Sequence, residues 1–261
     1  MLRRLKTDKS IIADLPEKNT ADHYALMRTE QAALYAATLL KLMEKIRKAE
    51  EAPDASSPSG RMARRGLALH HIHFASPPYT SLRAKLKVRA LARELAEYTG
   101  NCQLFVVPYT KPQEYIRDNA PDVLFTVLMR RSMLRIAKLV ADQSEMEALI
   151  TGESLAQVAS QTMQAIACTD AAQNLPILRP LIGMDKTEII AISRKIGTFD
   201  TSIEPYEDCC TIFTPPHPKT KPSLAEIEAA EAGMPGLAEL ERIAAETVEK
   251  IPIRIGDDPE F

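Results

Sequence analysis

The segment that decides the fold is LALHHIHF, residues 67–74, an apolar, histidine-rich run of strand length. From this point the chain alternates between strand-like and helix-like segments. Helical apolar spacing is found at 81–98 and 125–142. The further strand-like runs are QLFVVPY (103–109), EALITGES (147–154) and LPILRPLIG (175–183). This alternation is typical of an α/β fold with a mainly parallel sheet and flanking helices.

The composition is that of a globular protein without a membrane span. Hydrophobic residues make up 45% of the 261 residues, and the net charge is −2. A nucleic-acid contact would therefore need a local basic patch. Neither a bilayer-spanning run nor a signal peptide is found, so we expect a cytoplasmic protein. The four cysteines have no disulfide or zinc spacing, and no residues are assigned to a metal site.

The chain divides into four predicted parts. Residues 1–50 read as a basic start and a long helix, and 51–61, EAPDASSPSGR, read as a linker rich in Pro and Ser. The α/β part spans 62–228. The remainder, 229–261, has the charged pattern of a helical tail that covers an edge of the fold.

The carboxyl ends of parallel strands are where ligands bind in such a sheet. The most informative of these ends is TGES, residues 151–154. Gly152 allows a close backbone approach, and the N-terminus of the next helix would offer N–H groups to an anion. The alternative is a plain strand-to-helix turn capped by Ser154.

Five blocks in order resemble the catalytic domain of the ThiI family, from about Met62 to Glu228. That family comprises the tRNA 4-thiouridine synthetases (tRNA sulfurtransferases), which are PP-loop ATP pyrophosphatases also tied to thiamine biosynthesis. The blocks are HFASPPYTS (73–81), LMRRSMLRIA (128–137), TGESLAQVASQT (151–162), LPILRPLIGMDKTEII (175–190) and PYEDCCTIFTPPHPKTKP (205–222).

The resemblance implies a reaction and its participants. ATP adenylates the carbonyl oxygen of a tRNA uridine, which makes AMP the leaving group, and a cysteine persulfide then delivers sulfur. The implied cofactors are ATP and Mg²⁺. The implied partners are tRNA, a persulfide donor such as a cysteine desulfurase, and a second copy of the chain in a homodimer.

The resemblance also implies a set of nucleotide contacts. An arginine can bind phosphate through its fork of N–H groups, a glycine admits the adenosine, and a glutamine can hydrogen-bond. For Arg130 the alternative is a solvated helix face shared with Arg131 and Arg135. The matching positions are His73, Phe74, Arg130, Gly152 and Gln161.

The matching catalytic positions are Lys186, Cys209 and Asp54. Lys186 follows Asp185, whose spacing to Glu188 predicts a capping box, and it would neutralise the charge of the departing pyrophosphate. Its alternative is a surface lysine. Cys209 matches the cysteine of sulfur transfer, with Cys210 beside it. The alternative is that both are small buried apolar residues.

The family's phosphate loop, Ser-Gly-Gly-x-Asp-Ser, is replaced in this chain. Asp54 falls at the aspartate of the motif, but Ala55 stands for its serine. Glu50, Glu51 and Ala52 occupy the Ser-Gly-Gly positions. Carboxylates repel phosphate, and the glycine amides that would cradle it are missing. We therefore expect a chain that is weakly active or inactive by itself.

The family's first strand is also replaced. Residues 1–50 resemble a short Swi/Snf-type helicase fragment without that family's ATP-site motifs. The lost strand would be central in the sheet and would leave a slot between its neighbours. We expect that Thr20–Arg28, TADHYALMR, fills the slot. The alternatives are that the neighbouring strands close up or that the chain is marginally folded.

Two other functions fit the sequence. A non-catalytic nucleic-acid-binding or interaction protein could use the basic N-terminus and the HPKTKPS loop, residues 217–223. A related PP-loop activity would adenylate another carbonyl substrate. Salt-dependent RNA binding without ATP binding would favour the first of these.

Overall fold

The computed structural model describes residues 69–156, 160–206, 209 and 212–256. The predicted 1–50 and 51–61 parts, the helicase-like resemblance and Asp54 lie outside them. The strands are β1 His71–Ala75, β2 Cys102–Pro108, β3 Leu149–Ile150, β4 Ile177–Leu178 and β5 Glu249–Ile253. The helices are α4 Leu82–Thr99, α5 Thr110–Asn119, η2 Asp122–Leu124, α6 Phe125–Gln143, α7 Met163–Asp170, α8 Lys186–Lys195, α9 Phe199–Ser202, α10 Leu224–Ala232 and α11 Leu237–Glu246.

The predicted α/β fold is confirmed, and most of its strand pairs are parallel. β1 pairs in parallel with β2, and β5 pairs antiparallel with the other edge of β2. β3 and β4 form a second, parallel pair. Within the described ranges, β1 and β3 are not hydrogen-bonded to each other. The alternative in which the strands beside the predicted slot close up and pair directly is therefore wrong for the described residues.

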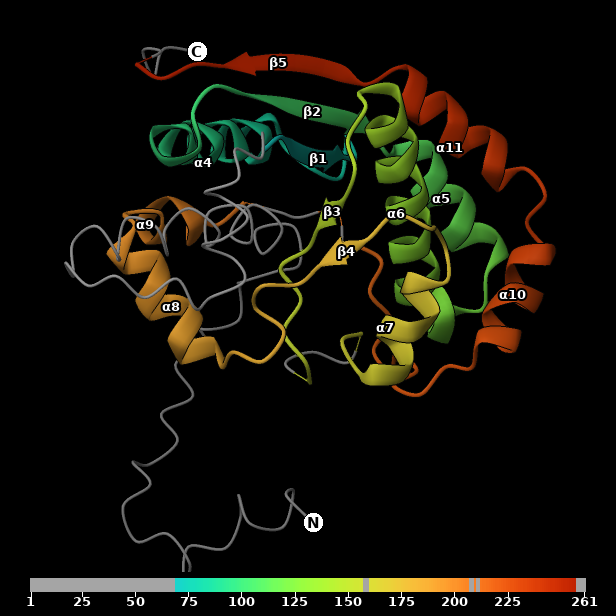
Figure 1. Ribbon diagram of the computed structural model, residues 1–261. Coiled ribbons are helices and arrows are strands. Elements are labelled where there is room, and N and C mark those ends of the chain that lie inside the picture. The colour runs from blue at the N-terminus through green and yellow to red at the C-terminus, as the bar shows by residue number, and fades with distance from the viewer. Residues whose placement is uncertain (1–68, 157–159, 207–208, 210–211, 257–261) are drawn as a thin grey trace, which may run out of the picture.

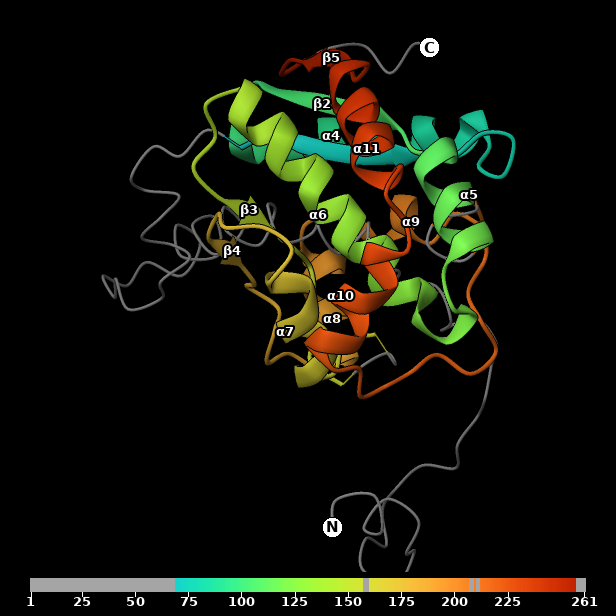
Figure 2. The same cartoon turned by 90° about the vertical axis from the view of Figure 1, so that its right-hand side faces the viewer.

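Helices cover both faces of the three-stranded sheet (Figures 1 and 2). The side chains of β2 alternate between these faces, as the period of a strand requires. Leu104 and Val106 pack with Val88 of α4, whereas Phe105 and Val107 belong to the larger core that contains α6 and α11. β2 is therefore buried on both sides, which explains its almost continuous apolar run.

The two predicted long helices form with the predicted faces inward. Ser81 caps α4 by accepting a hydrogen bond from the N–H of Ala84. Leu91 of α4 and Leu128 and Ile136 of α6 are almost fully buried. Because the buried residues recur at helical spacing, the sequence pattern was sufficient to place both helices.

The C-terminal segment contains more than the expected helical tail. α10 and α11 are followed by β5, which covers the edge of β2 as an edge-covering tail should. Arg131 of α6 donates to Glu231 at 2.8 and 2.9 Å, and Arg135 donates to Glu241 at 2.7 and 2.8 Å. These two bidentate arginine–glutamate ion pairs hold α10 and α11 against α6.

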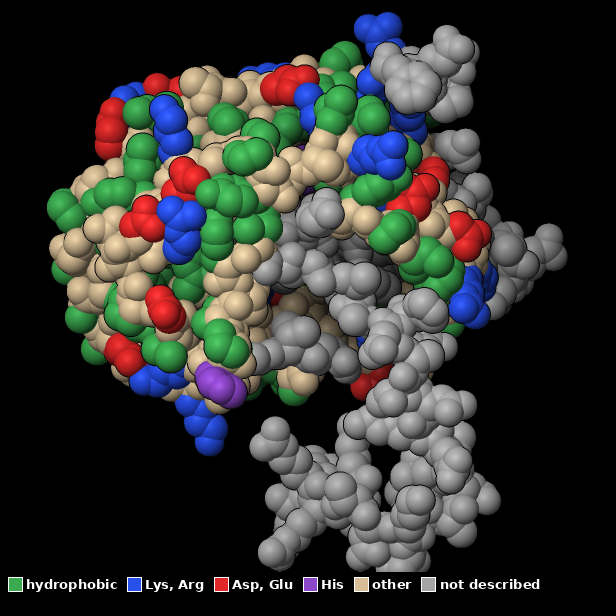
Figure 3. Space-filling view, turned by 180° about the vertical axis from the view of Figure 1, so that it is seen from behind, with side chains coloured by type: hydrophobic (Ala, Val, Ile, Leu, Met, Phe, Trp, Pro, Cys, Tyr) green, Lys and Arg blue, Asp and Glu red, His purple; other side chains and the backbone are tan. Residues whose placement is uncertain are grey.

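The described surface mixes charges of both signs. On the face shown in Figure 3, acidic and basic side chains are interspersed. Each described helix is too short or too polar to cross a lipid bilayer.

Candidate functional site

The carboxyl end of β1 is held against β2 by a compact turn. The N–H of Tyr109 donates to the carbonyl of Ala75 at 2.7 Å. The N–H of Ser76 donates to the hydroxyl of Thr80 at 2.8 Å, and the N–H of Thr80 returns to the carbonyl of Ser76 at 2.9 Å. These bonds fix where His73 and Phe74 lie at the end of the strand.

His73 is a buried side chain with orphaned polar atoms. It is 3% exposed, and neither ring nitrogen has a hydrogen-bond partner among the described residues. Burial, together with the positive charges of Lys85 and Lys87, lowers the pKa of His73 to about 4. The imidazole is therefore neutral at pH 7 and can both donate and accept a hydrogen bond.

Phe74 belongs to the core. Its ring contacts the ring of Tyr109 edge-to-face, with the centroids 5.3 Å apart. This arrangement is favourable for aromatic pairs and holds the end of β1 against the start of α5. The side chain of Phe74 thus stabilises the strand end.

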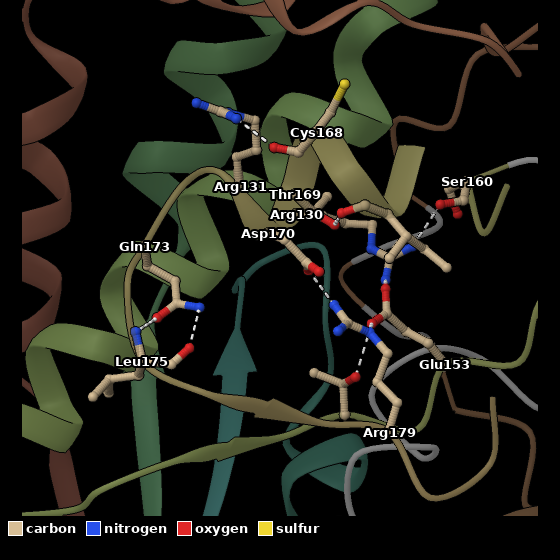
Figure 4. Close-up of polar contacts among 12 residues, drawn as sticks. Arg130, Arg131, Glu153, Ser160, Cys168, Thr169, Asp170, Gln173, Leu175 and Arg179 are labelled. Carbon is tan, nitrogen blue, oxygen red and sulfur yellow. Dashed lines mark hydrogen bonds and ion pairs between the residues drawn. The ribbon is translucent and has the colours of Figure 1, made fainter. Parts of the chain in front are cut away.

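Arg130 and Glu153 form the centre of the site (Figure 4). Arg130 projects from α6, is 8% exposed, and forms an ion pair with Glu153, which is 2% exposed. Its other terminal nitrogen donates to the carbonyl of Ser160 at 2.9 Å. The solvated-face alternative for Arg130 and its neighbours is therefore wrong. Because two of the five N–H groups are used, the fork retains donors for a ligand.

Glu153 binds a second arginine from the adjacent strand end. Its carboxylate accepts from Nε of Arg179 at 2.5 Å and from the hydroxyl of Thr151 at 2.8 Å. Arg179 is also paired with Asp170. Burial raises the pKa of Glu153, but the charges of Arg130 and Arg179 outweigh it and lower the pKa below its ordinary value. Glu153 is therefore ionised and holds both arginines in place.

The loop after β3 is fixed by Gln161 and Ser154. The side-chain oxygen of Gln161 accepts from the N–H of Ser154 at 3.1 Å. The hydroxyl of Ser154 donates to the carbonyl of Met184 at 2.6 Å. Gly152 and Gln161 are the chain neighbours of Glu153 and Ser160, the two residues that Arg130 contacts. The plain-turn alternative is wrong in one respect, because Ser154 bonds to Met184 and does not cap a helix.

Lys186 is the first residue of α8, and it is partly buried. The predicted capping box is confirmed, with the N–H of Asp185 donating to the carboxylate of Glu188 at 2.6 Å. The bond between Ser154 and Met184 places this helix start beside the loop that carries Gly152. Lys186 therefore lies near the strand-end cluster.

Cys209 is fully buried in the main core. Its carbonyl accepts a hydrogen bond from the side-chain amide of Gln113 at 2.6 Å. The same amide lies 3.8 Å from the sulfur of Met129, the residue before Arg130. Cys209 forms no disulfide with another described residue, and Cys210 lies outside the described residues.

Most of the chain matches the model of a known protein family. Residues 53–234 match the family model described as "Thiamine biosynthesis protein (ThiI)". The chain belongs to the ThiI family. The matched range is wider at both ends than the expected 62–228, and it includes Asp54 but not Glu50–Ala52.

Relatives of the ThiI family cover most of this chain. A probable tRNA sulfurtransferase of Moorella thermoacetica is 52% identical over 190 residues, which are 73% of this chain and 48% of the relative. One from Bacillus subtilis is 53% identical over 169 residues, 65% of this chain and 42% of the relative. The chain therefore spans about half the length of the curated relatives it matches.

A solved structure has the same arrangement. The crystal structure of a 4-thiouridine synthetase–RNA complex with bound ATP matches with a TM-score of 0.70 and 37% identity. The match covers 75% of this chain and 51% of that one. The shared fold and the ThiI family match agree with each other.

The residues that sequence reasoning missed are Glu153 and Arg179. Both lie in quoted ThiI-like blocks, but neither was given a role. Their proximity follows from the parallel pairing of β3 and β4, in which Ile150 is opposite Leu178. This register is a long-range feature of the structure and cannot be read from the sequence. The described residues contain no cluster of side chains suited to a metal ion.

Proposed function

We propose that this chain is the nucleotide-binding part of a ThiI-type tRNA sulfurtransferase. The observation that carries the proposal is Arg130, buried and oriented by Glu153, beside Gly152 at the carboxyl ends of β3 and β4. That edge of a parallel sheet is the usual place for a ligand. The family membership and the relatives named as tRNA sulfurtransferases support the same assignment.

The site suits the adenosine and phosphate groups of ATP, its proposed co-substrate. Arg130 offers N–H donors to phosphate, and the unpartnered nitrogens of His73 offer hydrogen bonds to a polar ligand. ATP would adenylate the carbonyl oxygen of a tRNA uridine, so that AMP becomes the leaving group. Lys186 at the start of α8 would neutralise charge that develops on pyrophosphate. Mg²⁺ is proposed with the nucleotide.

Sulfur transfer would involve Cys209. Because its thiol is fully buried, a persulfide donor could reach it only after local opening of the segment around it. We propose a separate protein, such as a cysteine desulfurase, as the donor and the cytoplasm as the compartment. A homodimer remains part of the proposal.

The replaced phosphate loop limits this activity. Glu50 and Glu51 stand at the positions where the family has serine and glycine, so their charges oppose the phosphates of ATP. We therefore propose that the chain alone binds ATP weakly and turns over slowly.

Calorimetric titration with ATP and Mg²⁺ tests both statements. The unchanged chain is expected to bind with a Kd weaker than about 1 mM. The variant E50S/E51G/A52G/A55S restores the motif and is expected to bind at least tenfold tighter. The control E50Q/E51Q removes the charges without supplying glycines and is expected to gain less.

The outcomes separate the alternatives. Micromolar affinity of the unchanged chain would contradict the loop argument while supporting ATP use. No gain in the restored variant would contradict the nucleotide-binding assignment. Salt-dependent RNA binding without any ATP heat in either protein would indicate the non-catalytic, nucleic-acid-binding function. Release of AMP that depends on tRNA, measured beside the Bacillus subtilis relative, tests the reaction itself.

A further inference from the structure

Two arginines share one buried carboxylate at the carboxyl ends of β3 and β4 (Figure 4). Glu153 pairs with Arg130 through one carboxylate oxygen and with Arg179 through the other. Burial raises the pKa of Glu153, but the two guanidinium groups outweigh burial and lower it, so the carboxylate is ionised. With two positive charges and one negative charge, these three residues, the arginine cluster, carry a net positive charge.

A second carboxylate pairs with Arg179 but lies nearer to solvent. Asp170, the last residue of α7, is 43% exposed. Solvent screens an exposed charge, so Asp170 offsets the arginine cluster only weakly. Glu153 is 2% exposed, whereas the side chains of Arg130 and Arg179 are 9% and 12% exposed. The accessible part of the cluster is therefore mainly arginine.

The arginines farther along α6 belong to a charge-balanced network. Arg131 and Arg135 pair with Glu231 and Glu241, which gives one carboxylate for each guanidinium group. These two glutamates are 19% and 4% exposed. The arginine cluster lacks a second buried carboxylate among the described residues. Since buried charges are normally paired, this imbalance is the arrangement expected where a ligand supplies negative charge.

The main chain fixes Arg179 next to the loop that follows β3. The N–H of Thr151 donates to the carbonyl of Leu178 at 3.0 Å, which extends the pairing of β3 with β4. Pro180 follows Arg179 and restricts its backbone to extended conformations. Arg179 therefore reaches Glu153 from the neighbouring strand end, independently of α6.

We propose that Arg179 is a positioning residue for phosphate binding at Arg130. With Arg130 as its only partner, Glu153 would cancel the positive charge of that arginine. Because Arg179 shares the carboxylate, the fork of Arg130 keeps a net attraction for a phosphate group. The inference rests on the proposed nucleotide-binding function and identifies the source of positive charge in that site.

Binding of AMP and of adenosine to the full-length chain tests this role. AMP keeps the α-phosphate but lacks the β- and γ-phosphates that the replaced loop would hold, and adenosine has no phosphate. NMR titration of the amide signals measures both affinities, including millimolar ones. Arg179→Gln is expected to weaken AMP binding at least about fivefold and to change adenosine binding less than about twofold.

Two further variants separate charge from structure. Arg179→Lys keeps the positive charge and is expected to recover most of the AMP affinity lost in Arg179→Gln. Asp170→Asn breaks the other ion pair of Arg179 but makes its surroundings more positive, so it is expected to bind AMP at least as tightly as the unchanged chain. A purely structural role would instead weaken AMP and adenosine binding together in all three variants.

The outcomes distinguish this inference from the proposed function. Equal AMP affinity in the unchanged chain and in Arg179→Gln would overturn the inference alone. A parallel loss of AMP and adenosine binding, or a loss in Arg179→Lys as large as in Arg179→Gln, would do the same. No binding of either ligand to the unchanged chain would contradict the nucleotide-binding function and the inference with it.

Discussion

Replacement of Glu153 by glutamine tests the electrostatic centre of the site. The wild-type carboxylate pairs with Arg130 and Arg179 and accepts a hydrogen bond from Thr151. Glutamine preserves the size of the side chain but removes its charge, and its amide N–H₂ would face a guanidinium. This side chain would then offer the two guanidinium groups one neutral acceptor oxygen in place of a carboxylate, while Arg130 keeps the carbonyl of Ser160 and Arg179 keeps Asp170.

The magnitude follows from the burial of the three groups. The side chains of Glu153, Arg130 and Arg179 are 2%, 9% and 12% exposed. Removing one partner of a buried ion pair costs about 3–5 kcal/mol. Because Arg179 keeps Asp170 as a partner, we expect a loss near the lower end, about 3 kcal/mol in the free energy of unfolding.

Urea denaturation at pH 7 measures this loss. The control Asp170→Asn breaks a pair whose carboxylate is 43% exposed, and it is expected to cost less than about 1 kcal/mol. The pKa of Glu153 is lowered in the folded state, so its contribution is complete above its unfolded value of 4.5 and is lost as the pH falls through the folded pKa. Equal losses in the two variants at pH 7 would refute the reasoning.

Three further predictions concern the core and the buried titratable groups. Leu128→Ala is expected to lower the free energy of unfolding by about 2–5 kcal/mol, because it leaves a cavity under α6, and urea denaturation measures this. The pKa of His73 is about 4 in the folded protein and 6.5 in the unfolded chain, so only the unfolded chain gains this proton as the pH falls from 6.5 to 4. The free energy of unfolding should therefore drop by up to about 3 kcal/mol over this range. The variant His73→Gln should lack this part of the pH dependence. Because Cys209 is fully buried, alkylation of its thiol in a Cys210→Ser variant should be at least about tenfold slower in the folded protein than in urea. Mass spectrometry of the peptide that contains Cys209 measures both rates, and equal rates would show that the thiol is accessible.

Local pattern was enough to predict several elements of the fold. The apolar spacing of Leu91 in α4 and of Leu128 and Ile136 in α6 predicted which helix faces are buried. The Asp185–Glu188 spacing predicted the start of α8. These features depend on residues within a few turns of each other, so they can be read along the chain. β5 was missed, because its pairing with β2 is a long-range contact.

The sequence by itself determined the alternating fold class and the family, because each is written in the order and spacing of residue types. Only the tertiary structure decided that Glu153 holds Arg130 and Arg179, that Cys209 is buried, and that a cavity separates β1 from β3. The physical reason is that charge pairing and burial depend on which strand ends and helix faces meet in space, and those contacts join residues that lie far apart in the chain.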